Sequence, residues 1–106
     1  MAVFDTVIVP TSLSPANTSE ATLYTGVSDT ALIVDASNID GTNSVDISIG
    51  VQPASGSTTW LVRTMPLPAA DAFRIGPIFI RVNDLIRVQI GTANDASFTA
   101  HGVRST

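Results

Sequence analysis

The stretch VDISIGVQ, residues 45–52, carries an aliphatic side chain at every second position. Aliphatic residues stand at the odd-numbered positions from Val45 to Val51, and polar or small residues stand between them. Successive side chains of a β-strand point to opposite faces of its sheet, so this alternation is typical of a strand with one buried face. The stretch is the clearest element of the chain, and it predicts a β-sheet protein.

Similar short runs recur on both sides of this stretch, and turn-forming residues separate them. We expect further strands near residues 3–9, 22–25, 31–36, 58–63, 72–75, 78–80, 85–90 and 97–103. The separators are residues 26–29, 40–41, 53–56, 66–68, 76–77, 83–84 and 91–95, which are rich in Gly, Pro, Asn and Asp. No window shows an apolar stripe at helical spacing with a cap. The pattern predicts an all-β protein, an antiparallel β-sandwich of about eight short strands with Greek-key or jelly-roll-like connections.

Residues 73–91, FRIGPIFIRVNDLIRVQIG, place three arginines within an apolar run. If residues 82–84 form a three-residue turn, the flanking strands make a hairpin whose inner face holds the alternating isoleucines and Val88. A two-residue turn would instead place Arg87 in the core, at a cost of roughly several kcal/mol for an unpaired charge. The outer face of the hairpin would carry Phe79, Arg81, Leu85 and Arg87. This amphipathic face is either a contact surface or a solvated strand face, and both alternatives remain open.

The first twenty residues differ in character from the rest. Aliphatic residues alternate along residues 3–9, and a polar, proline-bounded stretch follows. We divide the chain into an N-terminal strand or arm, residues 1–20, and a β-sandwich domain, residues 21–106. The segment either pairs within the domain, which we favour, or adds as an arm to the sheet of a neighbouring subunit. Phe4 and Ile8 are its candidate interface residues.

The composition limits the classes of function. The chain has 106 residues, room for one domain, and 13% of them are charged, about half of the ~25% usual in soluble domains. It contains no lysine, and arginine is the cation better suited to partial burial at interfaces. The net charge of −4 argues against nucleic-acid binding, which depends on clustered cations. Cysteine is absent, which excludes disulfides and thiolate metal sites, and we expect neither a signal peptide nor a membrane span.

Few residues are of the types that catalysis requires. His101 and Glu20 are the single histidine and glutamate, and no G-x-S-x-G, P-loop or dinucleotide-binding motif occurs. A Ser–His–Asp triad would have to be built around His101, which we interpret instead as a residue of the last strand. The segment DASNIDG, residues 35–41, offers oxygen ligands but lacks EF-hand spacing, and Asp40-Gly41 is typical of a turn. We therefore expect no enzymatic activity, no cofactor and no metal site.

Two aromatic residues are candidates for stacking on a sugar ring, Trp60 within TTWLVR and Tyr24. A single tryptophan in a small sandwich is more often part of the core or of a subunit contact. Glycan binding through these rings, together with loop Asp and Asn residues, would make the chain an adhesion module. Both interpretations of Trp60 remain open.

Most of the chain, from about Thr18 to Arg104, resembles a family of small structural proteins of tailed-phage virions. The resemblance rests on ATLYTGVSD at residues 21–29, ALIVDASNIDGTNSVDISIGV at residues 31–51, and LPAADAFRIGPIFIRVNDLIRVQIGTANDASFTAHGV at residues 67–103. These are strand and turn signatures without catalytic content. The chain departs from the family pattern at residues 81–84, where relatives commonly carry a glycine-containing turn of small residues. Residues 1–20 lie outside the resemblance.

The resemblance implies a non-enzymatic protein present in many copies on a tailed-phage particle. Our leading hypothesis is a capsid decoration, or cement, protein that binds neighbouring subunits of the major capsid protein. We expect it to be a homo-oligomer, with a trimer as one option, that is made in the host cytoplasm and located on the particle surface. The alternatives are a tail, fibre or baseplate module and a carbohydrate-binding adhesion domain. Neither nucleic acid nor membrane is an expected partner.

Overall fold

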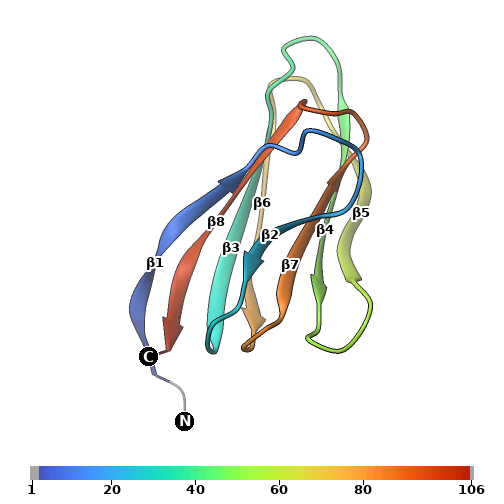
Figure 1. The fold of residues 1–106 in the computed structure, drawn as a ribbon. Coiled ribbons are helices and arrows are strands. Elements are labelled where there is room, and N and C mark those ends of the chain that lie inside the picture. The colour runs from blue at the N-terminus through green and yellow to red at the C-terminus, as the bar shows by residue number, and fades with distance from the viewer. Residues whose placement is uncertain (1–2, 106) are drawn as a thin grey trace.

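The computed structural model describes residues 3–105, which form eight β-strands (Figure 1). The strands are β1 (Phe4–Leu13), β2 (Ala21–Thr25), β3 (Thr30–Asn38), β4 (Val45–Gln52), β5 (Thr59–Leu67), β6 (Ala72–Ile80), β7 (Leu85–Ile90) and β8 (Ala96–Ser105). The described residues contain no helix, and therefore none that is long and apolar enough to cross a membrane. The prediction of an all-β protein is confirmed.

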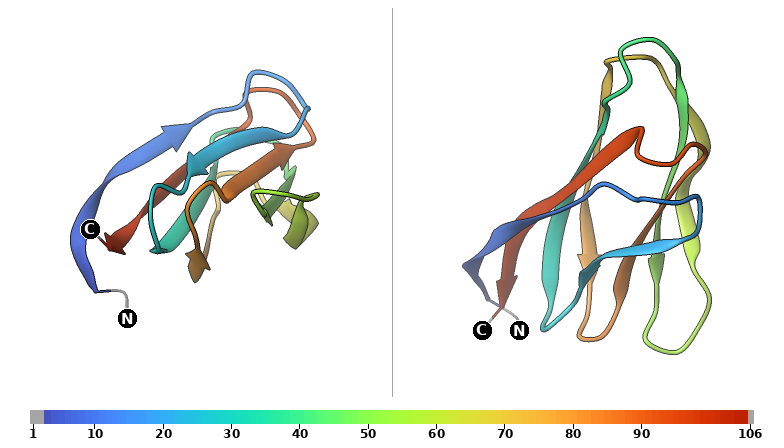
Figure 2. Two further views of the ribbon diagram at one scale, coloured as in Figure 1. Left: turned by 60° about the horizontal axis from the view of Figure 1, so that its bottom comes forward. Right: turned by 45° about the horizontal axis from the view of Figure 1, so that its top comes forward.

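The strands form two antiparallel sheets that enclose one core. Sheet A has the order β1-β8-β3-β6, and sheet B has the order β2-β7-β4-β5. The pairs are nested, because β1 pairs with β8, β2 with β7, β3 with β6, and β4 with β5. Apart from β4 and β5, consecutive strands lie in opposite sheets, and Figure 2 shows their connections crossing between the layers. This is a jelly-roll arrangement, so the predicted antiparallel sandwich is confirmed.

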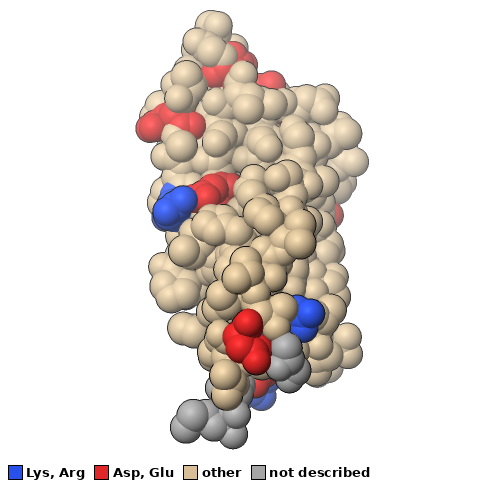
Figure 3. Space-filling model, turned by 90° about the vertical axis from the view of Figure 1, so that its left-hand side faces the viewer, with Lys and Arg blue, Asp and Glu red and all other residues tan. Residues whose placement is uncertain are grey.

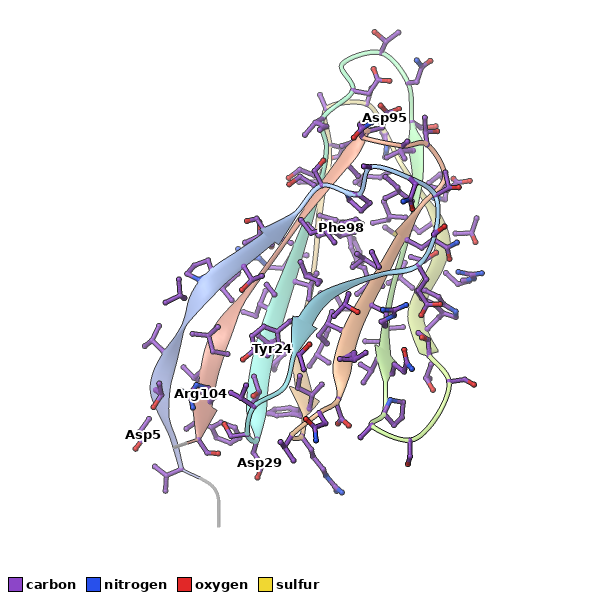
Figure 4. All side chains as sticks on the ribbon, in the orientation of Figure 1. Asp5, Tyr24, Asp29, Asp95, Phe98 and Arg104 are labelled. Atoms are coloured by element: carbon purple, nitrogen blue, oxygen red, sulfur yellow. The ribbon has the colours of Figure 1, made fainter. Side chains whose placement is uncertain are left out.

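The core is built from alternate residues of the strands in both sheets. In β3 the side chains of Leu32, Val34 and Ala36 are fully buried, and the residues between them are partly exposed. Phe98 of β8 is fully buried and lies between the two layers (Figure 4). Burying one such large apolar side chain stabilises a fold by roughly 1.5–3 kcal/mol. The other buried apolar residues are Ile8, Leu23, Val45, Ile47, Ile49, Leu67, Ile78, Ile80, Ile86, Val88, Ile90, Ala96 and Ala100.

The positions of the strands agree with the sequence pattern at most places. The strand predicted at residues 45–52 is β4, with the same bounds. The segments 72–75 and 78–80, predicted as separate strands, form the single strand β6, so the turn predicted at Gly76-Pro77 is wrong. These two residues lie at an irregularity in the pairing of β6 with β3, between Leu32 and Val34. The turn predicted at residues 66–68 also starts later, because β5 extends through Leu67.

The hairpin predicted from residues 78–80 and 85–90 is wrong. β6 is an edge strand of sheet A and β7 lies within sheet B, so the connection between them crosses from one sheet to the other. This connection pairs with the backbone of Gly26. The Asn83 amide donates to the Gly26 carbonyl at 2.7 Å, and the Gly26 amide donates to the Asp84 carbonyl at 2.8 Å. A hairpin and a crossover bury the same alternating residues, which is why local spacing did not distinguish them.

The edge strands are poorly suited to accept a further strand. β1 and β6 are the edges of sheet A, and β2 and β5 are the edges of sheet B. Each long edge strand contains a proline, Pro10 in β1, Pro66 in β5 and Pro77 in β6, and β2 has only 5 residues. Proline has no N–H to donate to a partner strand, and short or interrupted edges protect a sheet against strand addition.

The N-terminal strand is part of this chain's own sheet. β1 pairs with β8, with Val7 opposite Val103 and Leu13 opposite Phe98. Of the two alternatives for this segment, the structure has the pairing within the chain. The division into residues 1–20 and residues 21–106 stays a prediction, and residues 1–2 and 106 lie outside the described residues.

A substitution at Gly102 tests the close packing of β8 against β3. Gly102 has φ +155°, and a Cβ atom there would lie 2.0 Å from the carbonyl oxygen of Ala31. We expect Gly102→Ala to lower the free energy of unfolding by roughly 2 kcal/mol or more, because the backbone must shift. Gly41→Ala is the matched control, since a Cβ there meets nothing within 4 Å. Urea unfolding measures both, and equal stability of the two variants would contradict this packing.

Candidate functional site

A row of apolar side chains crosses the outer face of sheet A. The pairing register places four residues side by side, one from each strand, and we call them the outer apolar row: Val7, Val103, Ala31 and Phe79. Val7 is 78% exposed and Phe79 is 69% exposed, and Val9 of the same edge strand is 83% exposed. Contiguous exposed apolar surface of this kind is typical of interaction sites.

A charged cluster lies on the same face, beside the outer apolar row. Asp35 of β3 accepts hydrogen bonds from Arg74 of β6, from Nε to Oδ1 at 2.6 Å and from Nη2 to Oδ2 at 3.2 Å. Nε2 of His101 on β8 lies 2.9 Å from Oδ2 of the same carboxylate. The Arg74 bond, helped by His101, holds the pKa of Asp35 below its usual range, although partial burial acts in the opposite direction. The anion and the cation are bound to each other, so the cluster adds little net charge to the face.

His101 lies on β8, as the sequence predicted. Its partner Asp35 would suit the acid of a triad, but a triad also needs a hydroxyl bonded to the imidazole. Among residues 3–105 the side-chain hydrogen bond of His101 is the one to Asp35, while Ser12 and Thr99 on this face bond to each other at 3.1 Å. The face therefore offers ion pairing and hydrogen bonding rather than an assembled triad.

A hollow of about 310 Å³ lies next to Phe79 and extends the outer face of sheet A. Asp29, which is one of its lining residues, lies at the end of the molecule opposite to Asp95 (Figure 4). The hollow combines two aromatic rings with a carboxylate and a guanidinium, and it is lined by Phe4, Asp29, Thr30, Phe79, Ile80 and Arg81. It therefore continues the apolar surface toward this end of the sheet.

Polar side chains bonded to one another cover part of the outer face of sheet B. Arg87 of β7 donates from Nε to Glu20 Oε1 at 3.1 Å and from Nη1 to the hydroxyl of Thr22. Glu20 also accepts a hydrogen bond from the Thr58 hydroxyl. The Thr58 bond, followed by the contacts with Arg87, lowers the pKa of Glu20, and partial burial opposes this shift. These groups satisfy one another within the chain.

The two candidate glycan residues lie on opposite edges of sheet B. Tyr24 belongs to β2 and packs against the core, whereas Trp60 belongs to β5. The guanidinium of Arg63 lies 4.4 Å from the ring centroid of Trp60 and donates to Gln89 at 2.8 Å. β7 and β4 separate the two aromatic residues, so the structure does not bring them together. Their role in glycan binding stays a prediction.

The six candidate interface residues lie in three places. Three of them line the same hollow: Phe4, Phe79 and Arg81. Leu85 and Arg87 belong to β7 in sheet B, so the expectation that they share one face with Phe79 is wrong, because the chain crosses between the sheets after β6. Ile8 is 7% exposed and packs in the core of this chain. Whether these residues bind a partner stays a prediction.

Val7, Val103, Asp35 and Arg74 lie near one another on this face, which the sequence pattern did not predict. Alternation within each strand gives the face on which a residue lies, and it places Asp35 on the outer side of its strand. It does not say which strands are adjacent, and here β8 lies between β1 and β3. Only the pairing of strands distant in sequence reveals this surface.

Residues 35–38 form the end of β3, so the turn interpretation of residues 35–41 holds only for the connection that follows, which contains Asp40 and Gly41. The Asp40 carboxylate accepts backbone hydrogen bonds from Thr42 at 2.8 Å and from Asn43 at 3.3 Å, and these bonds, Thr42 first, lower its pKa. Asn38 is buried, and its amide donates to the carbonyls of Asn43 and Leu67. Within residues 3–105 no group of three or more His, Cys, Asp and Glu side chains is arranged to hold a metal ion.

Comparison with known proteins identifies the fold only. No family model matches the chain, and no curated protein is similar to it in sequence. Among solved structures, a chain of the IBDV viral particle has a TM-score of 0.51 at 6% identity, covering 94% of this chain and 32% of that one. A pentameric capsid protein from metagenomic phage sequences has a TM-score of 0.51 at 10% identity, covering 91% of this chain and 62% of that one.

A third similar structure is not viral. The core of Drosophila NLP, described in terms of pentamer formation and histone binding, has a TM-score of 0.53 at 10% identity and covers 94% of this chain and 99% of that one. This chain spans less than two thirds of each of the two viral chains. Identities this low establish a common fold and no common activity. The fold of this chain is therefore one that viral capsid proteins share with other proteins.

The hydrogen bond that Thr58 donates to Glu20, together with the ion pair of Glu20 and Arg87, makes stability depend on pH. The pKa of Glu20 is lowered in the folded protein, so its contribution is complete above the unfolded-state pKa and is lost as the pH falls through the folded-state value. We expect Glu20→Gln to lower the free energy of unfolding by roughly 0.5–1 kcal/mol at about pH 7, a value discounted for partial exposure, and by less at about pH 2.5.

Urea unfolding of both proteins at the two pH values measures this difference. Asp46→Asn is the control, because it removes an exposed carboxylate from the same sheet and leaves the ion pair of Glu20 and Arg87 in place. An equal loss of stability by Glu20→Gln at both pH values would contradict the assignment.

Proposed function

We propose that this chain is a non-enzymatic structural protein of a phage particle, which decorates the capsid by binding the lattice of the major capsid protein. The observation that carries the proposal is the outer face of sheet A, with its exposed apolar row and the adjoining hollow. An apolar face left in water is unfavourable, so its presence favours a protein that works in contact with others. The jelly-roll fold, which viral capsid proteins also have, supports the proposal by analogy.

Binding to a capsid lattice requires contact area and a defined orientation, and it requires no catalytic groups. The outer apolar row supplies surface that another subunit, a second copy of this chain included, can bury, and the polar groups of Asp35, Arg74 and His101 supply directional bonds at its border. The chain would act as a small homo-oligomer on the particle surface. Covering several lattice subunits with one oligomer multiplies weak contacts, so even modest individual interfaces hold it in place.

A tail, fibre or baseplate module is the alternative, since the same face could bind proteins of the tail. A carbohydrate-binding role has less support from the geometry. The Trp60 ring contacts the guanidinium of Arg63, and a Cβ at Gly50 would lie 3.0 Å from Trp60 Cε3, so the ring also lies close to the backbone of β4. Both contacts compete with a sugar for the surface of the ring.

Quantification of the chain in purified particles tests the proposal. We expect it to remain with capsids after the tails are detached, in numbers comparable with those of the major capsid protein. Isolated protein should also bind again to capsids from which it has been removed. Gel densitometry against the major capsid protein measures both.

The other outcomes identify the alternatives. A small number of copies that leave with the tails would support a tail module and contradict the capsid role. Absence from particles, together with glycan binding that Trp60→Ala abolishes without unfolding the protein, would support an adhesion domain instead.

A further inference from the structure

All four strands of sheet A contribute apolar side chains to its outer face. Val7 and Phe79, at the two ends of the outer apolar row, are strongly exposed on the two edge strands, and the smaller Ala31 lies between them with Val103. Val9 extends the apolar surface along β1. Removing apolar surface from water contributes about 25 cal/mol per Å², so covering this face is favourable.

Charge is nearly balanced on this face, although the chain has a net charge of −4. Asp35 is bound to Arg74, and the adjoining hollow contains both Asp29 and Arg81. Figure 3, which views the molecule from the side of β1, shows the charged groups as separate spots on a mostly uncharged surface. A second copy of the same face would therefore meet little net repulsion of like charges.

The ion pair of Asp35 and Arg74 on this face can also pair with the same two residues of a second copy. The Arg74 side chain is 66% exposed and that of Asp35 is 32% exposed, so both remain accessible while bound to each other. In an interface with two-fold symmetry, residue i of one copy contacts residue j of the other, and residue j contacts residue i. The Arg74 cation of each copy can then lie against the Asp35 anion of the other copy. A different protein is therefore not needed to supply the opposite charge.

The edge strands of sheet A disfavour strand addition, so a second copy is more favourably placed on the outer face than at an edge. Pro10 in β1 and Pro77 in β6 remove backbone donors from the two edge strands, so extension of the sheet by strand addition is disfavoured. Four strands about 4.8 Å apart and some 30 Å long present a face of roughly 600 Å² in projection. This is of the same order as the roughly 800 Å² of accessible surface that each partner buries in a standard interface.

We propose that the outer face of sheet A is a self-association surface, and that the same face of a second copy of this chain covers it with two-fold symmetry. The outer apolar rows of the two copies pack against each other, as the inner faces of sandwich sheets do, about 10 Å apart. The inference deepens the proposed homo-oligomer: the second copy occupies this face within the oligomer, so a capsid lattice would be bound by the remaining surfaces of the oligomer. The inference does not depend on a role in a phage particle.

Sedimentation equilibrium of the wild-type chain and of two matched variants tests this surface. Val7→Asp places a carboxylate in the outer apolar row at a position that is already exposed, so the fold should persist, and thermal unfolding checks this. Val27→Asp makes the same change at a residue 60% exposed in the connection between β2 and β3. We expect a wild-type dimer or a higher even oligomer, self-association at least about 10-fold weaker in Val7→Asp, and no change in Val27→Asp.

A monomeric wild-type chain, or a Val7→Asp variant with unchanged mass, would overturn the inference. A trimer or pentamer would also overturn it, because odd rings use two different surfaces of each copy. If the wild-type chain is monomeric and Val7→Asp abolishes binding to capsids, the face docks on the capsid protein, and the proposed function survives alone. A chain that pairs through this face but does not bind particles would leave the inference standing without the proposed function.

Discussion

The antiparallel pairing of the first strand with the last constrains the whole architecture. β8 lies between β1 and β3 and is hydrogen-bonded to both, and the other pairs are nested inside this one, down to β4 with β5. Because the nested strands belong alternately to the two sheets, their inward side chains meet in one core. A two-stranded hairpin alone is marginally stable in water, so each pair depends on the opposite sheet to cover its apolar face. The stability of any one strand is therefore a property of all eight.

The same constraint produces two outer faces of different chemistry. On sheet B, Glu20, Arg87 and Thr58 bond to one another, and Arg63 lies over Trp60, so polar groups of the chain satisfy their own partners. On sheet A, aliphatic and aromatic side chains form the outer apolar row, and the ion pair of Asp35 and Arg74, with His101, lies beside it. A polar side chain that is already hydrogen-bonded within its own chain gains little free energy from a partner. An apolar side chain exposed to water gains more when a partner covers it. This contrast is why the two proposals rest on sheet A.

The sequence was sufficient to predict most of the strands, but it was insufficient to predict which strands are adjacent. Alternation placed β4 at its observed bounds, and it assigned Ile78 and Ile86 to the core. It failed after β6, because a crossover and a hairpin bury the same residues, and the hydrogen bonds of Gly26 that favour the crossover come from a segment distant in sequence. The prediction of the candidate site was incomplete for the same reason. Phe79 was identified as an outward residue, but Val7 became its neighbour only through the pairing of β1, β8 and β3.

The central place of β8 in sheet A has a consequence for how the protein is made. A ribosome releases the N-terminal strands first, yet β1 has no neighbour to pair with in sheet A until residues 96–105 have emerged, because β8 lies between β1 and β3. During translation the outward valines of β1 therefore belong to an unpaired segment rather than to a finished face. A nascent copy cannot recruit another through this face until β8 is in position, which confines assembly to chains whose synthesis has passed β8.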